Sequence, residues 1–142
     1  MTSLRGVGYW IEQPGENHGD PLPDPARLLR SCGPRTHDPR VIAYLRSGRE
    51  FRVMLGFSYC RFGCGIADDE MGCRDLTDGE WVWPEGFAHY IEVHGLPLPD
   101  EFLATMNANR WQVPEVDESI DPFETGYGLA FWTAWCGEQM GR

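Results

Sequence analysis

The spacing of hydrophobic residues predicts a small sheet. Segment 50–61 is the best strand, because hydrophobic residues recur at every second position from Phe51 to Phe57 and give it one buried face. Shorter strands are predicted at 7–12 and 80–84, where aromatic and β-branched residues lie next to turn-forming ones. We expect these three segments to pair as an antiparallel sheet.

Helix-spaced hydrophobic residues and capping signals predict short helices around that sheet. Asp24-Pro25 and Asp38-Pro39 each place an Asp at the N-cap and a Pro at the first helical position. Gly48 is expected to end the second helix in a left-handed conformation. The predicted helices are 25–31, one beginning at 39, 85–94, 99–108 and 123–138, with irregular loops at 63–75 and 115–124. The expected fold is therefore α+β: a small antiparallel sheet of three or more strands with four to five short helices, in a single globular domain covering 1–142.

Composition and charge narrow the class of protein. The chain is 42% hydrophobic and 24% charged, which excludes a largely disordered protein. Its net charge of −10 repels phosphate backbones and anionic lipid, so we expect no nucleic acid and no membrane as partner. A small molecule or a protein partner fits better. All 12 basic residues are Arg, which is typical of a GC-rich bacterial genome.

The cytoplasm is the expected compartment. No apolar run approaches the roughly 20 residues of a membrane-spanning helix, and the N-terminus has no signal-peptide pattern. The five cysteines are an odd number, which disfavours a complete disulfide framework.

Cysteines and histidines gather in the region 57–97 and make it the candidate site. Cys60 and Cys64 stand at the end of a predicted strand, each close to a Gly, and such turns present thiolates to zinc. Cys73 is a candidate third ligand. The fourth candidate is His94 or His89, with Asp75 as a weaker choice. Two alternatives stay open: the cysteines are buried hydrophobic residues, or they supply a regulatory disulfide or a reactive thiol.

A second hypothesis is acid–base catalysis. Glu85 and His89 are four residues apart on a predicted helix, close enough for the carboxylate to orient the imidazole as a general base. Asp78, in the adjoining turn, is a further catalytic candidate. No nucleophile or oxyanion motif accompanies them, so an exposed Glu–His pair without catalytic function is the alternative.

A third hypothesis is a recognition surface in the same region. Aromatic and Arg side chains line many ligand pockets, and the candidates here are Trp81, Trp83, Tyr90, Arg61 and Arg74. The alternative is that the tryptophans belong to the hydrophobic core.

The same region carries a family resemblance. The runs GFSYCRF and MGCRDLTDGEWVWPEGFAHYIEVHGLPLPDEF resemble a family of small, mostly bacterial, uncharacterised proteins. The family pattern is close to GYS-x-CRF-C-G followed by TDG-x-WPEGLAHYV-x-x-H-x-LP-x-F. Where a C-x2-C would stand, this chain has C-x3-C, with Gly63 as the extra residue. The resemblance implies no particular activity.

These observations favour a small soluble binding or accessory module. Its 57–97 region would receive a small ligand or a protein partner, with zinc as a candidate structural ion. The alternative is a small-molecule enzyme that uses His89 and Glu85.

Overall fold

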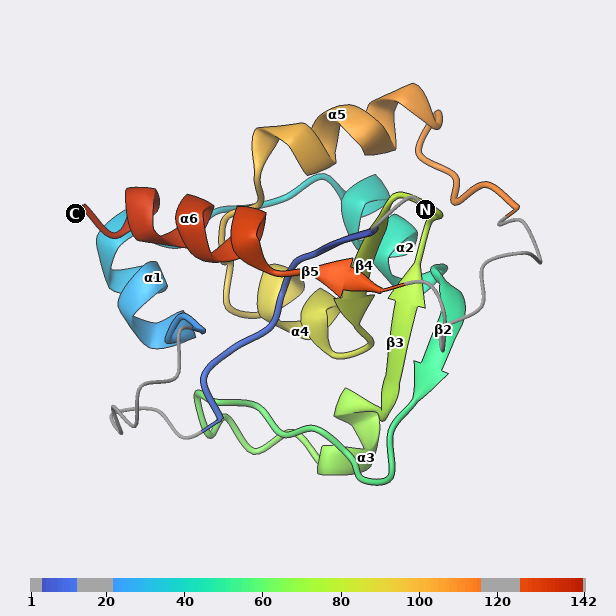
Figure 1. Ribbon diagram of the computed structural model, residues 1–142. Coiled ribbons are helices and arrows are strands. Elements are labelled where there is room, and N and C mark those ends of the chain that lie inside the picture. The colour runs from blue at the N-terminus through green and yellow to red at the C-terminus, as the bar shows by residue number, and fades with distance from the viewer. Residues whose placement is uncertain (1–3, 13–21, 116–125, 142) are drawn as a thin grey trace.

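A mixed sheet forms the centre of the fold (Figure 1). The computed structural model describes residues 4–12, 22–115 and 126–141. The strands in these ranges are β1 (Leu4–Gly6), β2 (Arg49–Val53), β3 (Arg74–Thr77), β4 (Trp81–Pro84) and β5 (Tyr127–Gly128). The helices in these ranges are α1 (Pro25–Cys32), α2 (Pro39–Arg46), α3 (Asp68–Met71), α4 (Phe87–Glu92), α5 (Asp100–Ala108) and α6 (Ala130–Gln139). The predicted α+β class is confirmed.

The sheet combines antiparallel and parallel pairs. Its strand order is β2-β3-β4-β1-β5, and β3 runs antiparallel to both of its neighbours, β2 and β4. Strand β1 runs parallel to both β4 and β5. Strands β4 and β5 lie on either side of β1, and the chain passes from β4 to β5 by a long connection that contains α4 and α5. The expected antiparallel sheet is thus found only from β2 to β4. Alternating hydrophobic residues within one segment indicate a strand, but they do not show whether it pairs in a parallel or an antiparallel direction.

Strand β2 is much shorter than the predicted 50–61. Only Phe51 is buried, whereas Val53, Leu55 and Phe57 have relative exposures of 59%, 109% and 59%. The chain leaves the sheet after Val53. Val53 pairs with Arg74, the first residue of β3, so β3 has no further residue with which the next residues of the chain could pair. The departing segment is held by two backbone bonds, from Met54 N to Cys73 O (2.7 Å) and from Ser58 N to Gly72 O (2.9 Å). It therefore lies beside the turn that precedes β3.

The first strand also differs from its prediction. Strand β1 covers Leu4–Gly6, and the predicted segment 7–12 leaves the sheet. Val7 N still donates to Val82 O at 2.9 Å, and Gly8 then turns the chain with a φ of 79°. This turn sends Trp10 into the core, where it is buried. The aromatic residues of this segment therefore pack as core residues of a loop.

The two Asp-Pro signals are confirmed as helix starts. Asp24 Oδ1 accepts from Ala26 N, and Asp38 Oδ1 accepts from Arg40 N, both at 2.9 Å. The predicted left-handed cap at Gly48 is wrong, because the C-cap of α2 is Ser47. Gly48 is needed for another reason: a Cβ there would lie 2.6 Å from the Trp83 ring.

The remaining helix predictions hold in part. Helices α4 and α5 lie inside the predicted 85–94 and 99–108. The last helix begins at Ala130 and not at 123, because β5 precedes it. The predicted loop 63–75 contains α3 and the start of β3, while most of the loop 115–124 falls outside the described residues. No helix in the described ranges is long and apolar enough to cross a membrane.

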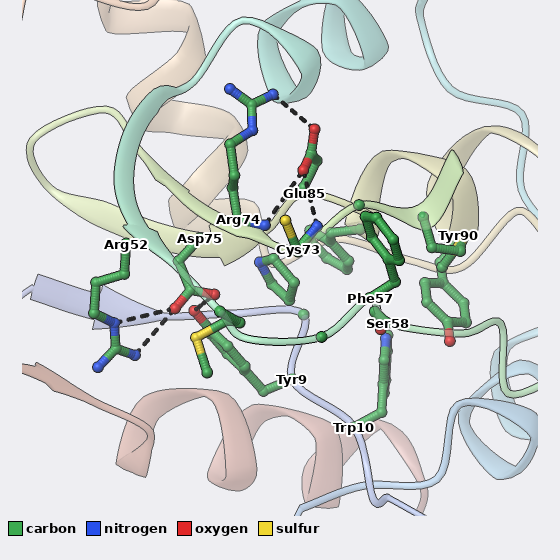
Figure 2. Close-up of a pocket in the computed structure, with 18 of the residues that line it drawn as sticks. Tyr9, Trp10, Arg52, Phe57, Ser58, Cys73, Arg74, Asp75, Glu85 and Tyr90 are labelled. Atoms are coloured by element: carbon green, nitrogen blue, oxygen red, sulfur yellow. Dashed lines mark hydrogen bonds and ion pairs between the residues drawn. The ribbon is translucent and has the colours of Figure 1, made fainter. Parts of the chain in front are cut away.

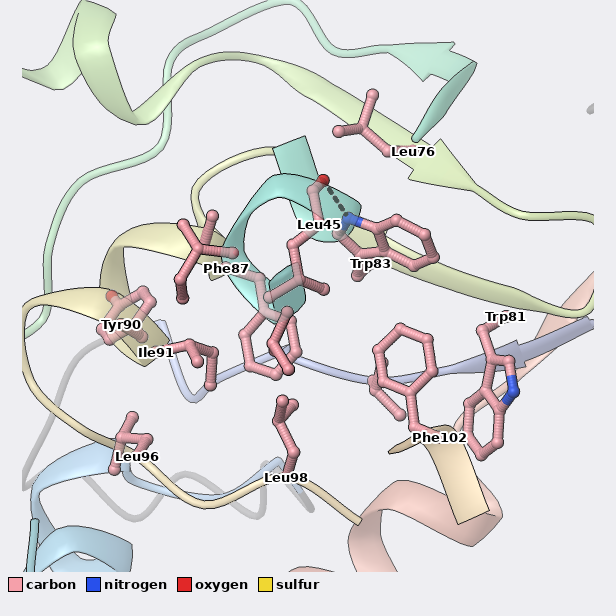
Figure 3. Packing of buried hydrophobic residues seen from close by; sticks show 14 of the residues in the cluster. Leu45, Leu76, Trp81, Trp83, Phe87, Tyr90, Ile91, Leu96, Leu98 and Phe102 are labelled. Carbon is pink, nitrogen blue, oxygen red and sulfur yellow. Dashed lines mark hydrogen bonds between the residues drawn. The ribbon is translucent and has the colours of Figure 1, made fainter. Parts of the chain in front are cut away.

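The two faces of the sheet are covered unequally. Trp81, Trp83 and Leu76 belong to the main core with residues of the helices, and Trp83 Nε1 donates to Leu45 O at 2.9 Å (Figure 3). The other face carries a small cluster of Leu4, Phe51 and Val82, with the Tyr9 and Tyr127 rings packed against it. This thinner layer adjoins the pocket described below.

Candidate metal centre and adjoining pocket

Two cysteines and two histidines converge at one point of the structure. The ligand atoms of Cys60, Cys64, His89 and His94 all lie within 4.8 Å of one another. The Cys60 and Cys64 sulfur atoms are 3.7 Å apart. Each sulfur also faces an imidazole nitrogen: Cys60 Sγ lies 3.4 Å from His94 Nε2, and Cys64 Sγ lies 3.4 Å from His89 Nε2.

The sulfur–sulfur separation and both of these sulfur–nitrogen separations match the edges of a zinc tetrahedron. With Zn–S near 2.3 Å and Zn–N near 2.05 Å, tetrahedral angles place two sulfurs about 3.8 Å apart and a sulfur and a nitrogen about 3.5 Å apart. The structure has 3.7 Å for the sulfur pair and 3.4 Å for both sulfur–nitrogen pairs. Two Cys and two His are also a common structural zinc set. The donor types and their spacing therefore fit Zn²⁺.

The cysteines are presented by a tight turn in the segment 54–67, which connects β2 to α3. Gly63 N donates to Cys60 O at 3.0 Å, and Gly63 has a φ of 62°, which a residue with a Cβ rarely adopts. The extra residue of the C-x3-C spacing is thus the one that closes the turn. Burial raises the pKa of the Cys60 thiol, while backbone hydrogen bonds from Phe62 and Cys64 to its sulfur act in the opposite direction. A divalent cation at this point would deprotonate the thiol.

The histidines come from α4 and the residues just after it. His89 lies within α4, and His94 follows the helix before Gly95 turns the chain. The Phe62 ring stacks on the His94 ring with centroids 4.2 Å apart. Burial lowers the pKa of both imidazoles, and the positive charge of Arg46 lowers that of His89 further. Both rings are thus held in the neutral form, which has a lone pair for a metal.

The cluster differs from the predicted ligand set by one residue. Cys60, Cys64 and His94 are brought together, and His89 completes the group. Cys73 lies elsewhere, in the wall of the pocket, where its backbone N–H donates to Glu85 Oε1 at 3.2 Å. It begins the entry to β3, which directs it to the sheet and away from the turn that carries Cys60.

A pocket of about 340 Å³ lies next to the group of Cys60, Cys64, His89 and His94. Figure 2 shows the residues that line this pocket. One wall is formed by Phe57, Ser58 and Arg61, which belong to the same segment 54–67 as the two cysteines. The other walls come from the segment 8–10, the ends of β2 and β3, the start of α4, and Tyr127. The Cys2His2 group and the pocket therefore share one irregular stretch of chain, the segment 54–67.

Tyr90 connects the two sites. Its hydroxyl accepts from Arg61 N at 2.9 Å and donates to Tyr59 O at 3.3 Å. Burial raises the pKa of Tyr90 to about 12, so the hydroxyl keeps its proton. The ring also lies near His94, with centroids 6.2 Å apart. Because α4 carries both Tyr90 and His89, this helix fixes the segment 54–67 at the pocket side and at the cluster side.

Two ion pairs hold the polar side of the pocket. Arg52 Nη2 donates to Asp75 Oδ2 at 3.0 Å and to the Tyr127 hydroxyl at 2.7 Å, and the Tyr9 hydroxyl donates to Asp75 Oδ1 at 3.0 Å. The Arg74 guanidinium donates to Glu85 Oε2 at 2.6 Å, which lowers the pKa of that carboxyl. These pairs fix two of the three pocket arginines.

The predicted ligand-binding residues divide between the pocket and the core. Arg61, Arg74 and Tyr90 line the pocket. Trp81 and Trp83 are fully buried in the main core, because alternate positions of β4 point to the helix-covered face. Their ring nitrogens donate to Thr105 Oγ1 and to Leu45 O, so both are satisfied within the protein.

The structure does not bring the predicted catalytic residues together. Glu85 is bonded to Arg74 and to the backbone of β3, whereas the charges that act on His89 are those of Arg46, Glu92 and Glu70. Asp78 lies in the turn at the opposite end of the β3–β4 hairpin. There it accepts from Glu80 N, Trp81 N and the Tyr44 hydroxyl, and burial raises its pKa. The position of Asp78 is that of a turn-stabilising residue.

The sequence does not predict four of the pocket residues: Tyr9, Trp10, Arg52 and Tyr127. They come from three distant parts of the chain and meet through the strand order of the sheet, in which β1 and β5 follow β4 and β2 pairs with β3. The aromatic pair Tyr9-Trp10 was the one local signal, and it was assigned to a strand.

Comparison with known proteins adds no assignment. No family model, no curated protein and no solved structure matches this chain.

Proposed function

We propose that this chain is a binding module in which a Cys2His2 zinc centre holds one wall of a pocket for a small ligand. The observation that carries the proposal is the convergence of Cys60, Cys64, His89 and His94 at separations that suit a zinc tetrahedron. Zinc joins the segment 54–67 to α4, and that segment contributes Phe57, Ser58 and Arg61 to the pocket. A reducing, cytoplasmic compartment suits a centre with free thiols.

The role of zinc here is structural. All four positions of the tetrahedron are supplied by protein side chains, which leaves no open position for a water or a substrate. Metal-binding energy then becomes folding energy, because the unfolded chain has no preformed site. The zinc centre would therefore stabilise an irregular segment that has few backbone hydrogen bonds of its own.

Cys64 gives the sharpest test of the zinc centre because its side chain is exposed. Without a metal, Cys64→Ser should change the free energy of unfolding by less than about 0.5 kcal/mol, as for other surface substitutions. With zinc bound, the same substitution should lower it by about 3 kcal/mol or more. Cys73→Ser is the matched control, since Cys73 lies outside the cluster.

The measurement combines metal content with denaturant unfolding of untagged protein. We expect about one zinc per chain in the wild type and in Cys73→Ser, and much less in Cys64→Ser. A strong chelator should reduce the wild type to the stability of Cys64→Ser and leave that variant unchanged. A metal-free wild type whose unfolding does not respond to added zinc or to chelator would refute the zinc centre.

A further inference from the structure

We infer that the pocket takes a small ligand with a flat apolar body and a single negative charge, the class of the aromatic carboxylates. The inference rests on the proposed function, because it treats the pocket as a ligand site and names the class of the ligand. It is carried by three properties of the lining: an uncompensated Arg, aromatic walls and a buried N–H group without a partner.

The pocket is locally positive in a strongly negative protein. Its lining contains Arg52, Arg61 and Arg74 against the two carboxylates Asp75 and Glu85, an excess of one positive charge. The whole chain has a net charge of −10. At physiological salt the screening length is about 8 Å, so the adjacent charges dominate over those on the far surface. An anion of charge −1 would neutralise the lining.

Arg61 is the source of that excess. Within the described residues its guanidinium contacts no carboxylate; it donates to the neutral acceptors Ile11 O (3.2 Å), Ser58 Oγ (3.1 Å) and Tyr59 O (2.9 Å). It also stacks over the Tyr59 ring at 4.3 Å. The side chain is thus held in a fixed position, and no carboxylate among the described residues neutralises its charge. These three hydrogen bonds use Nε and Nη1, so Nη2 is the nitrogen that can donate to the carboxylate of a ligand.

The apolar walls favour a flat molecule. Tyr9 and Tyr127 stack on each other with ring centroids 5.3 Å apart, and Trp10 and Phe57 add two further rings to the lining. The volume of about 340 Å³ lies near the lower end of ordinary ligand pockets. A compact body of one or two rings therefore fits, whereas a nucleotide or a peptide is too large.

Trp10 supplies a hydrogen-bond donor that lacks an acceptor. In the described part of the chain, Trp10 Nε1 is the buried side-chain polar atom without a hydrogen-bond partner. Such a group costs about 1–3 kcal/mol until an acceptor reaches it. Figure 2 shows the indole nitrogen directed toward Ser58, whose hydroxyl already accepts from Arg61. A carboxylate beside Ser58 would thus meet Arg61 and the Trp10 N–H together.

Three matched test ligands separate charge from shape: 2-naphthoate, its neutral amide 2-naphthamide, and the cation 2-naphthylmethylamine. Their binding to the full-length, zinc-supplemented protein is measured by isothermal titration calorimetry. We expect 2-naphthoate to bind at least roughly tenfold more tightly than the amide, and the amine to bind most weakly.

Met54 provides a charge test that leaves the fold intact. It lines the pocket, yet it is 51% exposed, so a polar side chain is tolerated there. Met54→Glu cancels the excess positive charge, and Met54→Gln is the neutral control of the same size. We expect Met54→Glu to raise the Kd of 2-naphthoate roughly tenfold above that of Met54→Gln, with equal affinity of the two variants for the amide.

Arg61→Gln tests the proposed anchor. It should raise the Kd of 2-naphthoate by a larger factor than Met54→Glu, because a direct contact is lost as well as a charge. Arg49→Gln is its control, since Arg49 is an exposed residue of β2 outside the pocket and its loss changes the net charge equally. Should Arg61→Gln unfold, the Met54 pair still decides the question.

The outcomes separate this inference from the proposed function. Equal binding of 2-naphthoate and 2-naphthamide, or equal binding of 2-naphthoate to Met54→Glu and Met54→Gln, overturns the anionic class and leaves a small-ligand pocket in place. No binding of any of the three compounds overturns the inference, and the zinc centre is then decided by the metal content and the unfolding of Cys64→Ser. Zinc content is measured on the same sample, so a metal-free protein that prefers 2-naphthoate supports the inference while it refutes the zinc centre.

Discussion

Glu85 joins the start of β3 to the residues that precede α4. Its Oε1 accepts from the backbone N–H groups of Cys73 and Arg74 at 3.2 and 3.3 Å, and its Oε2 accepts from the Arg74 guanidinium at 2.6 Å. Its side chain is 27% exposed, so solvent weakens these interactions without removing them. Glu85 thereby positions Arg74 in the pocket wall.

The pH dependence of stability should report this role of Glu85. The hydrogen bond from Arg74 lowers the pKa of Glu85 in the folded state below the usual 4.5 of a free Glu. The folded state then binds fewer protons than the unfolded state, so the stabilisation is present above about pH 4.5 and is lost as the pH falls through the folded pKa. We expect Glu85→Gln to cost about 1 kcal/mol at neutral pH and progressively less in acid.

Urea unfolding of the wild type and Glu85→Gln between about pH 3 and pH 7 measures that difference. Any zinc release in acid affects both proteins and cancels in the comparison. A difference that stays constant over this range would show that the Glu85 carboxylate has no charge-dependent role.

At the scale of single residues, the sequence predicted chemistry better than position. Cys60, Cys64 and His94 were identified because thiols and imidazoles beside glycines are typical metal ligands, and the structure brings them together. Cys73 is of the same residue type, yet the entry to β3 separates it from the cluster. Arg61 was identified as a pocket residue, but its lack of a carboxylate partner depends on three acceptors that only the folded chain provides.

At the scale of elements, helices were predicted more accurately than strands. The caps Asp24 and Asp38 act within their own segments, so local sequence is enough to place α1 and α2. The length of β2 depends on how far its neighbour β3 extends, which the alternation from Phe51 to Phe57 cannot reveal. Strand β2 lies at the edge of the sheet, so β3 is its one neighbour in the sheet.

Gly48 provides a prediction on how α2 packs against the sheet. A Cβ at this position would lie 2.6 Å from the Trp83 ring and 2.7 Å from Leu76 Cβ, and both partners are fully buried and cannot withdraw. We expect Gly48→Ala to lower the free energy of unfolding by roughly 1–3 kcal/mol through overpacking. Denaturant unfolding followed by tryptophan fluorescence measures it.

Gly56→Ala is the control for that experiment. Gly56 has no atom near the added Cβ and lies in the exposed part of the segment 54–67, so the change should stay within about 0.5 kcal/mol. If Gly48→Ala were as mild as Gly56→Ala, the close approach of α2 to Trp83 would be wrong.

At the scale of the whole molecule, the core and the proposed zinc centre would stabilise different parts. The main core contains residues from β3, β4 and all six helices. The segment 54–67 contributes only Cys60 to the buried core, with Phe62 and Ile66 packed at its edge. Loss of zinc should therefore loosen this segment and leave the core folded.

Hydrogen exchange followed by mass spectrometry can test this division. After chelation we expect peptides that cover 54–67 to exchange at least roughly tenfold faster, while peptides from α2 and α5 stay protected. Far-UV circular dichroism should change little, since most of 54–67 lies outside helices and strands. Cys64→Ser should reproduce the chelated pattern without chelator.

Chelation can also test whether the proposed zinc centre and the pocket depend on each other. Because Phe57, Ser58 and Arg61 belong to the segment that the proposed zinc would hold, chelation should also weaken binding of 2-naphthoate, and zinc should restore it. By reciprocity, 2-naphthoate should raise the equilibrium affinity of the protein for zinc in competition with a chelator, whereas 2-naphthamide should have a smaller effect. In the hydrogen-exchange measurement, faster exchange throughout the core after chelation would mean that zinc stabilises the entire fold. Unchanged exchange in 54–67 would mean that the pocket wall is stable without a metal, and the two sites would then act independently.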